Sequence, residues 1–312
     1  MVALIRKVPL DPNLDFIGKR KICLAFSAFL VLASVGIFLF QGLNFGVDFR
    51  GGILIEIRTD GPADLGELRD ELGGLDLGEV TLQEFGEPTD VLINVQRQEG
   101  EEAAQNAAIE TVKNALGERV VEYRRVEFVG PKVGEELREA GILATILALG
   151  AIGIYIWFRF EWQFAVAALA ALTHDVIATV GFFALTQIEF NLSTLAAVLT
   201  IAGYSINDTV VVFDRTREEL RRYKRRPVLE IYNMSINRTI SRTTMTSVTT
   251  LLALISLSVF GGEVIRGFSL GLIWGIVVGT YSSVGLAIPL LNMMNLRASH
   301  VAPPEPTSQE AS

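Results

Sequence analysis

Cysteine and histidine are nearly absent from this chain of 312 residues. It has one cysteine, Cys23, so no disulfide can form within the chain, and its two histidines, His174 and His300, lie far apart in the sequence. Transition-metal sites are built from clusters of such side chains. The sequence therefore predicts no metal site, no cofactor and no enzymatic activity. Cys23, at the start of an apolar stretch, is interpreted as a small residue that faces lipid or a neighbouring helix.

Charge is missing from long stretches of the chain. Half of the residues are hydrophobic, the mean hydropathy is +0.40, and several apolar runs are long enough to cross a hydrocarbon core of about 30 Å. The sequence thus predicts an α-helical membrane protein with six transmembrane helices. The first run is too long for a cleaved signal peptide and no small-residue cleavage site follows it. The predicted spans are Ile22–Phe40, Ala140–Phe158, Trp162–Leu185, Leu192–Phe213, Thr243–Phe260 and Phe268–Leu291.

The charges that are present are segregated by sign. Residues 44–139 hold 22 acids and 10 bases, whereas residues 214–242 hold nine bases and four acids. Short basic loops stay in the cytoplasm, so residues 1–21 and the basic loop 214–242 are predicted to be cytoplasmic. The polar tail 295–312 is predicted to be disordered on the same side. Residues 44–135 are then exported to the opposite side of the membrane. A multi-pass membrane protein with both termini in the cytoplasm fits this pattern, and no nucleic-acid partner is expected.

The exported segment 44–135 alternates between strand and helix patterns. GGILIEIRT has isoleucines on one face, DLGELRDEL is a short helix, and the strands GEVTLQEFG and TDVLINVQRQ follow with EPTD between them. An amphipathic helix, EEAAQNAAIETVKNALG, and a last strand, RVVEYRRVEFVG, complete the order β-α-β-β-α-β. This order predicts a small α+β ferredoxin-like domain. It has no Cys/His cluster and no phosphate-binding loop, which favours contact with another protein over catalysis.

Glycine-rich motifs stand at both ends of this domain. GVDFRGG follows the first span and GPKVG precedes the second. Because glycine tolerates positive φ and close backbone approach, two interpretations are open: hinges that let the domain swing, or simple linkers to the membrane part. The hinge candidates are Gly46, Gly51, Gly52, Gly130 and Gly134.

Two acids lie inside apolar spans, Asp208 in the fourth and Asp175 in the third. An ionised side chain at bilayer depth costs about 2.5–3.5 kcal/mol on insertion scales, so such residues are usually kept for proton or ion movement or for pairing. Asp208 follows GYSIN, whose glycine, serine and asparagine weaken the helix. The sequence therefore predicts a proton-relay site at Asp208, with Asp175 in the same polar network.

Arg242 is the predicted partner of Asp208. The fourth and fifth spans run in opposite directions, so their cytoplasmic ends can be neighbours, and an arginine stem can cover the roughly 7 Å between Asp208 and the end of its span. Hydroxyl residues share a helical stripe with Arg242. Two interpretations of this stripe are open: a water-holding proton path, or small residues that pack between helices. The candidates for a polar path are His174, Asn207, Thr243, Thr246 and Thr250.

The motifs together resemble the SecF family. They are GVDFRGG, GPKVG, HDV in the third span, GYSINDTVVVFDRTRE in the fourth, and NMSINRTISRTTMTSVTT into the fifth. SecF proteins are the smaller membrane subunits of the bacterial SecDF protein-export accessory complex. The resemblance implies half of an RND-type transporter that pairs with SecD and works with SecYEG, SecA and preproteins. It implies a drive by the proton-motive force, with Asp208 and Arg242 as the proton-linked pair. It also implies a place in the bacterial inner membrane, with residues 44–135 in the periplasm.

Two other functions remain possible from the residues themselves. An RND-type exporter of small molecules would share the intramembrane acid, but it should carry two six-span repeats and large exported domains. A passive scaffold subunit would use Asp208 and Arg242 only as a structural pair.

Overall fold

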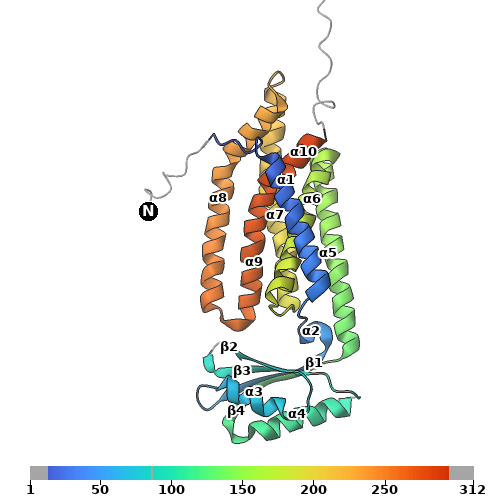
Figure 1. The fold of residues 1–312 in the computed structure, drawn as a ribbon, viewed down its shortest axis with the longest axis vertical. Helices are drawn as coiled ribbons and strands as arrows, with labels where there is room; N and C mark the ends of the chain where they lie inside the picture. Colours follow the sequence, from blue (N-terminus) through green and yellow to red (C-terminus); the bar gives the residue numbers. More distant parts are fainter. Residues whose placement is uncertain (1–12, 86, 101, 295–312) are drawn as a thin grey trace, which may run out of the picture.

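A computed structural model describes residues 13–85, 87–100 and 102–294. The predicted tail and most of the predicted N-terminal segment lie outside these residues. The chain forms a helical bundle and a small α+β domain at one end of it (Figure 1). We call that end of the bundle the domain end and the opposite end the distal end.

The α+β domain has the predicted order of elements. Strand β1 (Gly52–Thr59) is followed by helix α3 (Leu65–Gly73), and strands β2 (Val80–Phe85) and β3 (Glu87–Gln96) come next. Helix α4 (Glu102–Leu116), a 3₁₀ turn (Gly117–Arg119) and strand β4 (Val120–Val129) complete it. The antiparallel sheet has the order β2-β3-β1-β4. The ferredoxin-like prediction is therefore confirmed in order and in topology.

Alternation along the strands sets the two faces of this sheet. Ile53, Ile55 and Ile57 of β1 are fully buried, in one cluster with Leu72 of α3 and Val112 of α4. Successive side chains of a strand point to opposite faces. One face of the sheet is thus sealed by α3 and α4, and the other faces the helical bundle (Figure 1).

Six helices of the described residues are long and apolar enough to span a membrane. They include α1 (Arg20–Gln41), α5 (Pro131–Arg159), α6 (Trp162–Thr186), α7 (Leu192–Arg222) and α8 (Val228–Phe260). The sixth spanning segment is built from α9 (Gly262–Ser282), a π-helical turn (Ser283–Ala287) and α10 (Ile288–Met293). Long apolar helices can hydrogen-bond every backbone group internally, which a bilayer requires.

Two predicted loops are shorter in the structure. Residues 214–242 were expected to form a basic loop, but α7 continues to Arg222 and α8 begins at Val228, so only residues 223–227 connect them. The connection left between the predicted spans Thr243–Phe260 and Phe268–Leu291 is also mostly helix, because α9 begins at Gly262. Hydropathy marks the apolar part of a helix and misses a polar extension beyond it.

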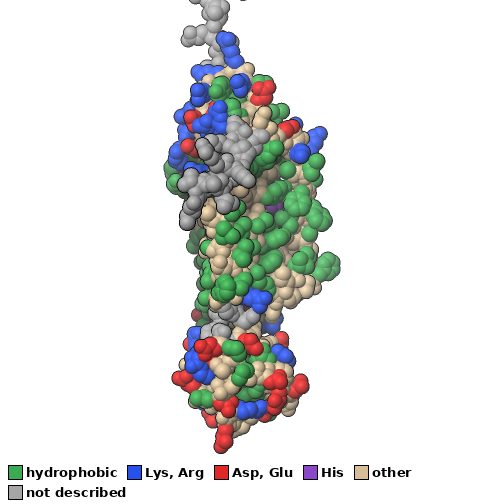
Figure 2. All heavy atoms as spheres, turned by 90° about the vertical axis from the view of Figure 1, so that its left-hand side faces the viewer, with side chains coloured by type: hydrophobic (Ala, Val, Ile, Leu, Met, Phe, Trp, Pro, Cys, Tyr) green, Lys and Arg blue, Asp and Glu red, His purple; other side chains and the backbone are tan. Residues whose placement is uncertain are grey.

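The helices differ in how much of their surface is covered. In the most apolar window, 61% of α6 and 67% of the segment containing α9 are buried, against 11% for α1 and 17% each for α5 and α8. Helices α6 and α9 are therefore the most closely packed against their neighbours, and α1, α5 and α8 expose apolar side chains on the outside of the bundle. Figure 2 shows this apolar belt between a basic distal end and the charged α+β domain.

The domain joins the bundle through the short helix α2 (Val47–Arg50). Phe45 forms an isolated parallel bridge with Phe190, in the connection between α6 and α7, and the Phe190 amide donates to the Asn44 carbonyl at 2.7 Å. Phe49 of α2 stacks on Phe190 with 5.9 Å between ring centroids. The junction is a packed apolar contact rather than a loose tether.

Candidate functional site

Asp175 on α6 lies at the centre of the bundle and is fully buried. Its Oδ2 accepts hydrogen bonds from Ser205 of α7 at 2.6 Å and from Ser282 of α9 at 2.7 Å. Its Oδ1 lies 2.9 Å from Nδ1 of His174, which donates in the tautomer that carries the proton on Nδ1. Three donors from three helices therefore hold this carboxylate. Ser205 and Ser282 were not predicted as site residues, because nothing local in the sequence shows what their hydroxyls reach.

A run of glycines on α9 permits this close approach. An added Cβ at Gly271 would contact Phe183 of α6, and one at Gly275 would overlap Ile201 of α7. At Gly279 it would lie 3.0 Å from the Ser205 side chain and 3.5 Å from Asp175 Oδ2. Small residues every fourth position are a common device for packing membrane helices. This spacing is visible in the sequence and would have located α9 in the centre.

Asp208 lies on the same buried face of α7, three residues after Ser205, and its side chain is 3% exposed. Its Oδ2 is buried and has no hydrogen-bond partner among the described residues. Arg242 of α8 is the charged side chain that acts on it electrostatically, but the described residues contain no hydrogen bond or ion pair between the two. The structure thus brings this predicted pair into the same region without direct contact.

His174 lies next to Tyr281, which contacts the outer helix α1. Its Nε2 is buried without a partner among the described residues, and its ring centroid lies 6.4 Å from that of Tyr281 on α9. The Tyr281 hydroxyl donates to the Cys23 carbonyl of α1 at 2.6 Å and lies 3.0 Å from the Ser27 hydroxyl. His174 therefore lies beside a hydrogen-bonded group that joins α9 to α1, and its described hydrogen bond is the one to Asp175.

The predicted polar path is only partly assembled. Thr243 is buried and its hydroxyl has no partner among the described residues, while Thr246 donates to carbonyls of its own helix. Thr250 also donates to its own helix and accepts from the Tyr204 hydroxyl of α7 at 3.3 Å. Asn207 is exposed on the surface of α7. Among the described residues these hydroxyls do not form an unbroken hydrogen-bonded chain, and a water-holding path along them stays a prediction.

The distal ends of α7 and α8 are joined by a buried carboxylate. Glu219 of α7 is fully buried and pairs with Arg215 at 2.6 Å and with Arg238 of α8. Losing one partner of a buried ion pair is strongly destabilising. This cluster, which the sequence did not predict, fixes the two long helices against one another beyond the apolar belt.

The five candidate hinge glycines differ from each other. Gly51 and Gly52 have φ of 74° and 150°, which other residues rarely adopt. At Gly46 a Cβ would overlap the Glu189 carboxylate, and at Gly134 of α5 it would lie 2.9 Å from the Phe49 carbonyl oxygen. Gly130 is the N-cap of α5 and has more room. Four of them are thus required by backbone shape or close packing, and hinge motion stays a prediction.

Glu189, between α6 and α7, lies against the sheet face of the α+β domain that is turned toward the bundle. Burial raises the pKa of this carboxyl above its ordinary value, and a hydrogen bond from Gln83 of β2 at 3.3 Å opposes that shift.

In the part of the chain that the structure describes, no three Cys, His, Asp or Glu side chains are grouped as metal ligands would be.

Comparisons with known proteins agree with one another. The family described as "Protein export membrane protein SecD/SecF, C-terminal" matches residues 108–297, and the "SecD/SecF GG Motif" matches residues 36–63. Protein translocase subunit SecF of Rickettsia rickettsii is 48% identical over 93% of this chain and 94% of its own length. The SecF of Magnetococcus marinus is 52% identical over 91% of this chain and 92% of its own length.

A solved structure has the same fold. The crystal structure of SecDF, a translocon-associated membrane protein from Thermus thermophilus, superimposes with a TM-score of 0.80 at 34% identity. The match covers 91% of this chain but only 39% of the SecDF chain. This chain therefore corresponds to about two fifths of that longer protein.

Proposed function

The chain belongs to the SecD/SecF family of protein export membrane proteins, and from this premise we propose that it uses the proton-motive force to assist export. It is an integral membrane subunit of the SecF type, which serves Sec-pathway protein export. The proposal adds that it pairs with a SecD subunit in a bacterial inner membrane, with both termini in the cytoplasm. It further adds that the pair acts with SecYEG and SecA on preproteins, without an enzymatic reaction of its own.

The observation that carries the proposal is the difference between the two buried acids. Asp175 accepts three hydrogen bonds, whereas a buried oxygen of Asp208 has no partner among the described residues, and the nearby cation Arg242 acts on it only electrostatically there. Burial disfavours the charged form of a carboxylate, and hydrogen bonds to that form oppose the effect. A buried carboxylate with few hydrogen bonds is therefore stabilised more by protonation than one with three. We therefore assign proton binding to Asp208, modulation by charge to Arg242, and positioning of α6, α7 and α9 to Asp175.

The energy available is adequate for a conformational change. One elementary charge crossing 100 mV is worth about 2.3 kcal/mol, which shifts a two-state equilibrium roughly fifty-fold. Protonation of Asp208 removes its interaction with Arg242, which lies on a neighbouring helix. The relative position of α7 and α8 is thus the element that the proton would bias, and the α+β domain at the end of the bundle is what would move.

The test compares Asp208→Asn with Asp214→Asn, the same change six residues further along α7 at an exposed residue that pairs with Arg159 at 3.3 Å. Preprotein export is measured in membrane vesicles with the proton gradient intact and collapsed. We expect stimulation by the gradient in the Asp214 variant and none in the Asp208 variant, with equal export once the gradient is collapsed. Gradient-stimulated export by Asp208→Asn would contradict the proposal.

Two further results would favour the other functions. A passive scaffold predicts that Asp208→Asn lowers the amount of assembled complex rather than its response to the gradient. A small-molecule exporter predicts active efflux without any effect on preprotein export. Co-purification with the partner subunit, measured for both variants, separates loss of assembly from loss of proton coupling.

A further inference from the structure

We propose that the gap between the α+β domain and the helical bundle binds an extended segment of an unfolded polypeptide. The gap is defined by two neighbouring cavities of about 360 and 810 Å³ that share the walls Asn44, Val47, Gln83 and Glu189. Ligand-binding clefts in proteins have volumes of about 300–1,000 Å³. The inference rests on the proposed function, because protein export would supply such a segment on this side of the membrane.

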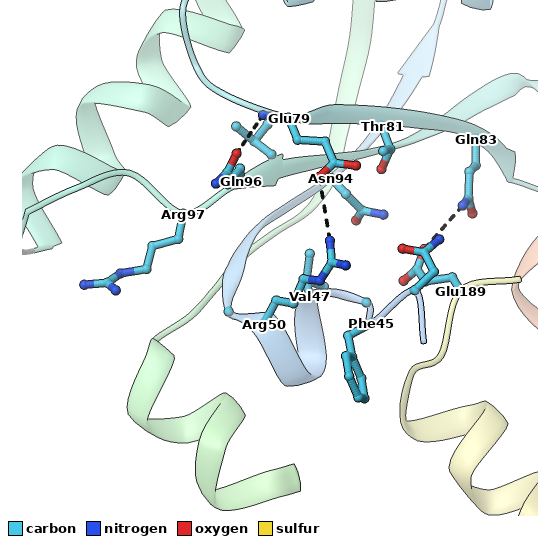
Figure 3. A pocket seen from close by; sticks show the side chains of 14 residues that line it. Phe45, Val47, Arg50, Glu79, Thr81, Gln83, Asn94, Gln96, Arg97 and Glu189 are labelled. Carbon is cyan, nitrogen blue, oxygen red and sulfur yellow. Dashed lines mark hydrogen bonds and ion pairs between the residues drawn. The ribbon is translucent and has the colours of Figure 1, made fainter. Parts of the chain in front are cut away.

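The roof of the gap is the sheet face that α3 and α4 do not cover. Thr81 and Gln83 of β2 and Asn94 of β3 line it and project toward the bundle (Figure 3). Asn94 is 7% exposed, and its buried Oδ1 has no hydrogen-bond partner among the described residues. Leaving a buried acceptor unsatisfied costs about 1–3 kcal/mol. The site is therefore built to receive an N–H donor.

Two polar bridges cross the gap, one at either side of Thr81 and Asn94. Arg50 of α2 pairs with Glu79, just before β2, at 3.6 Å, and Gln83 donates to Glu189 at 3.3 Å (Figure 3). The first pair is more than half exposed on both sides, and exposed pairs of this kind are worth little. The Arg50–Glu79 bridge can therefore open for a ligand at low cost, while the packed junction at α2 holds the domain in place.

The lining favours a peptide backbone over a particular side chain. An extended chain offers one N–H donor and one C=O acceptor per residue, spaced by about 3.3 Å. Amide side chains, which both donate and accept, stand on the sheet at Gln83 and Asn94 and on the bundle side at Asn44 and Gln187. Such a lining suits segments of varied sequence, as an export substrate requires.

The charges of the gap argue for the same occupant. Arg50 and Glu189 line the first cavity, and Arg125 and Glu127 line the second. A phospholipid headgroup, the other ligand available beside a membrane, would be served by a cluster of basic side chains for its phosphate. Acids and bases are instead interspersed, which tolerates either charge sign on the bound segment.

The test places a photo-crosslinking amino acid at Thr81, in the roof of the gap. The control carries the same residue at Asn114, exposed on α4 on the opposite side of the sheet. The full-length protein is studied with its partner subunit, during export of a precursor arrested with an unfolded segment in transit. We expect crosslinks to the precursor at least tenfold stronger from position 81 than from position 114.

A second substitution tests the buried acceptor. Asn94→Leu removes the Oδ1 acceptor and is expected to weaken the crosslink from position 81 about fivefold or more, whereas Asn94→Asp, which keeps an acceptor oxygen, should weaken it less. A melting curve for each variant shows whether the domain is folded. Equal crosslinking from positions 81 and 114 would overturn the inference, and so would adducts at position 81 that contain only phospholipid or only the partner subunit.

The same crosslink separates this inference from the proposed function. In the Asp208→Asn background, precursor crosslinks at position 81 without gradient-stimulated export would leave the binding site standing and identify proton coupling as a separate step. Gradient-stimulated export in the unsubstituted protein without any precursor crosslink at position 81 would contradict the binding site and leave proton coupling intact.

Discussion

Ser282 donates a hydrogen bond to Asp175 at 2.7 Å from the last residue of α9, directly before a π-helical turn. Turns of this kind are rare in helices and often stand at functional sites. Ser205 donates to the same carboxylate oxygen from α7 at 2.6 Å. Asp175 is therefore the point at which three helices and one break in helix geometry meet.

The first prediction concerns this meeting point. Hydrogen bonds between membrane helices contribute about 0.6 kcal/mol each on average. Ser205→Ala and Ser282→Ala should each lower the free energy of unfolding by about that amount, and Asp175→Ala, which removes all three bonds, by about 2 kcal/mol. Thermal unfolding in detergent measures these differences. An Asp175→Ala protein as stable as the single serine variants would show that the network does not hold the helices.

A second prediction uses the glycines of α9. Gly275→Leu forces a side chain into Ile201 of α7, and overpacking of this kind typically costs about 1–3 kcal/mol. The matched control is Gly150→Leu on α5, where an added side chain meets open space and where leucine favours the helix. We expect a lower melting temperature and less membrane-integrated protein only for the α9 variant. Equal loss in both would indicate a general effect of leucine insertion.

The third prediction separates two glycines of the junction. An added Cβ at Gly134 would lie 2.9 Å from the carbonyl oxygen of Phe49, whereas at Gly130 the nearest atom is 3.9 Å away. Gly134→Ala should loosen α2 from α5 and increase hydrogen exchange of residues 46–52 about tenfold. Gly130→Ala replaces an N-cap residue and should cost at most about 1 kcal/mol. Unchanged exchange in Gly134→Ala would mean that the backbone shifts to accept the methyl group.

A fourth prediction concerns the acid stability of the α+β domain. Asp90 is buried and accepts from Arg58 at 2.7 and 3.0 Å and from Arg124 at 2.8 Å. The hydrogen bond from Arg58 lowers the pKa of Asp90, with Arg124 adding to the shift and burial opposing it. The stabilisation is therefore complete above the unfolded pKa of about 3.9 and is lost as pH falls through the lower, folded pKa.

Asp90→Asn should accordingly lower the melting temperature of the domain at pH 7, and part of its loss of stability in acid should disappear. The control is Asp70→Asn, an exposed position on α3, which should behave as the parent protein. Melting curves between pH 2 and pH 7 give both results. Parallel pH profiles for parent and Asp90→Asn would show that the ion pair is formed in the unfolded chain as well.

The fifth prediction concerns Glu189, whose pKa is raised by burial. A carboxyl whose pKa is higher when the domain contacts the bundle stabilises that contact at pH values below its ordinary pKa. This stabilisation is lost as pH rises through the raised pKa. Glu189→Gln should therefore tighten the contact with β2 at pH 7 and change it little in acid. Hydrogen exchange of residues 80–85 measures this. Faster exchange in the variant at pH 7 would contradict the assigned direction.

Much of the fold could be predicted because its signals are local. The alternation of Ile53, Ile55 and Ile57 gave a strand with one buried face, and the turns between patterns gave the order of the α+β domain. The apolar runs gave six membrane helices. The predictions failed where polar residues continue a helix, as between Phe213 and Arg222, because hydropathy measures burial in lipid and not helix formation.

The candidate site was predictable in its acids and not in its contacts. Asp175, Asp208 and Arg242 stand out because charge inside an apolar span is costly. The serines that bind Asp175 do not stand out, because a hydroxyl is tolerated in any membrane helix. Asn207 was expected in the polar path and is exposed on α7, because helical position alone does not say which neighbour covers a face.

The sequence by itself determined the class of the protein, the number of its spans, the order of its domains and the acids worth attention, because hydrophobic periodicity and buried charge are properties of short stretches. Only the tertiary structure decided which of the two acids accepts hydrogen bonds from neighbouring helices. Asp175 and Asp208 have similar surroundings in the sequence, but the glycines of α9 bring Ser282 to the first, and no donor among the described residues reaches Oδ2 of the second. That difference depends on how the helices pack in three dimensions. The gap between the α+β domain and the helical bundle also depends on the tertiary structure.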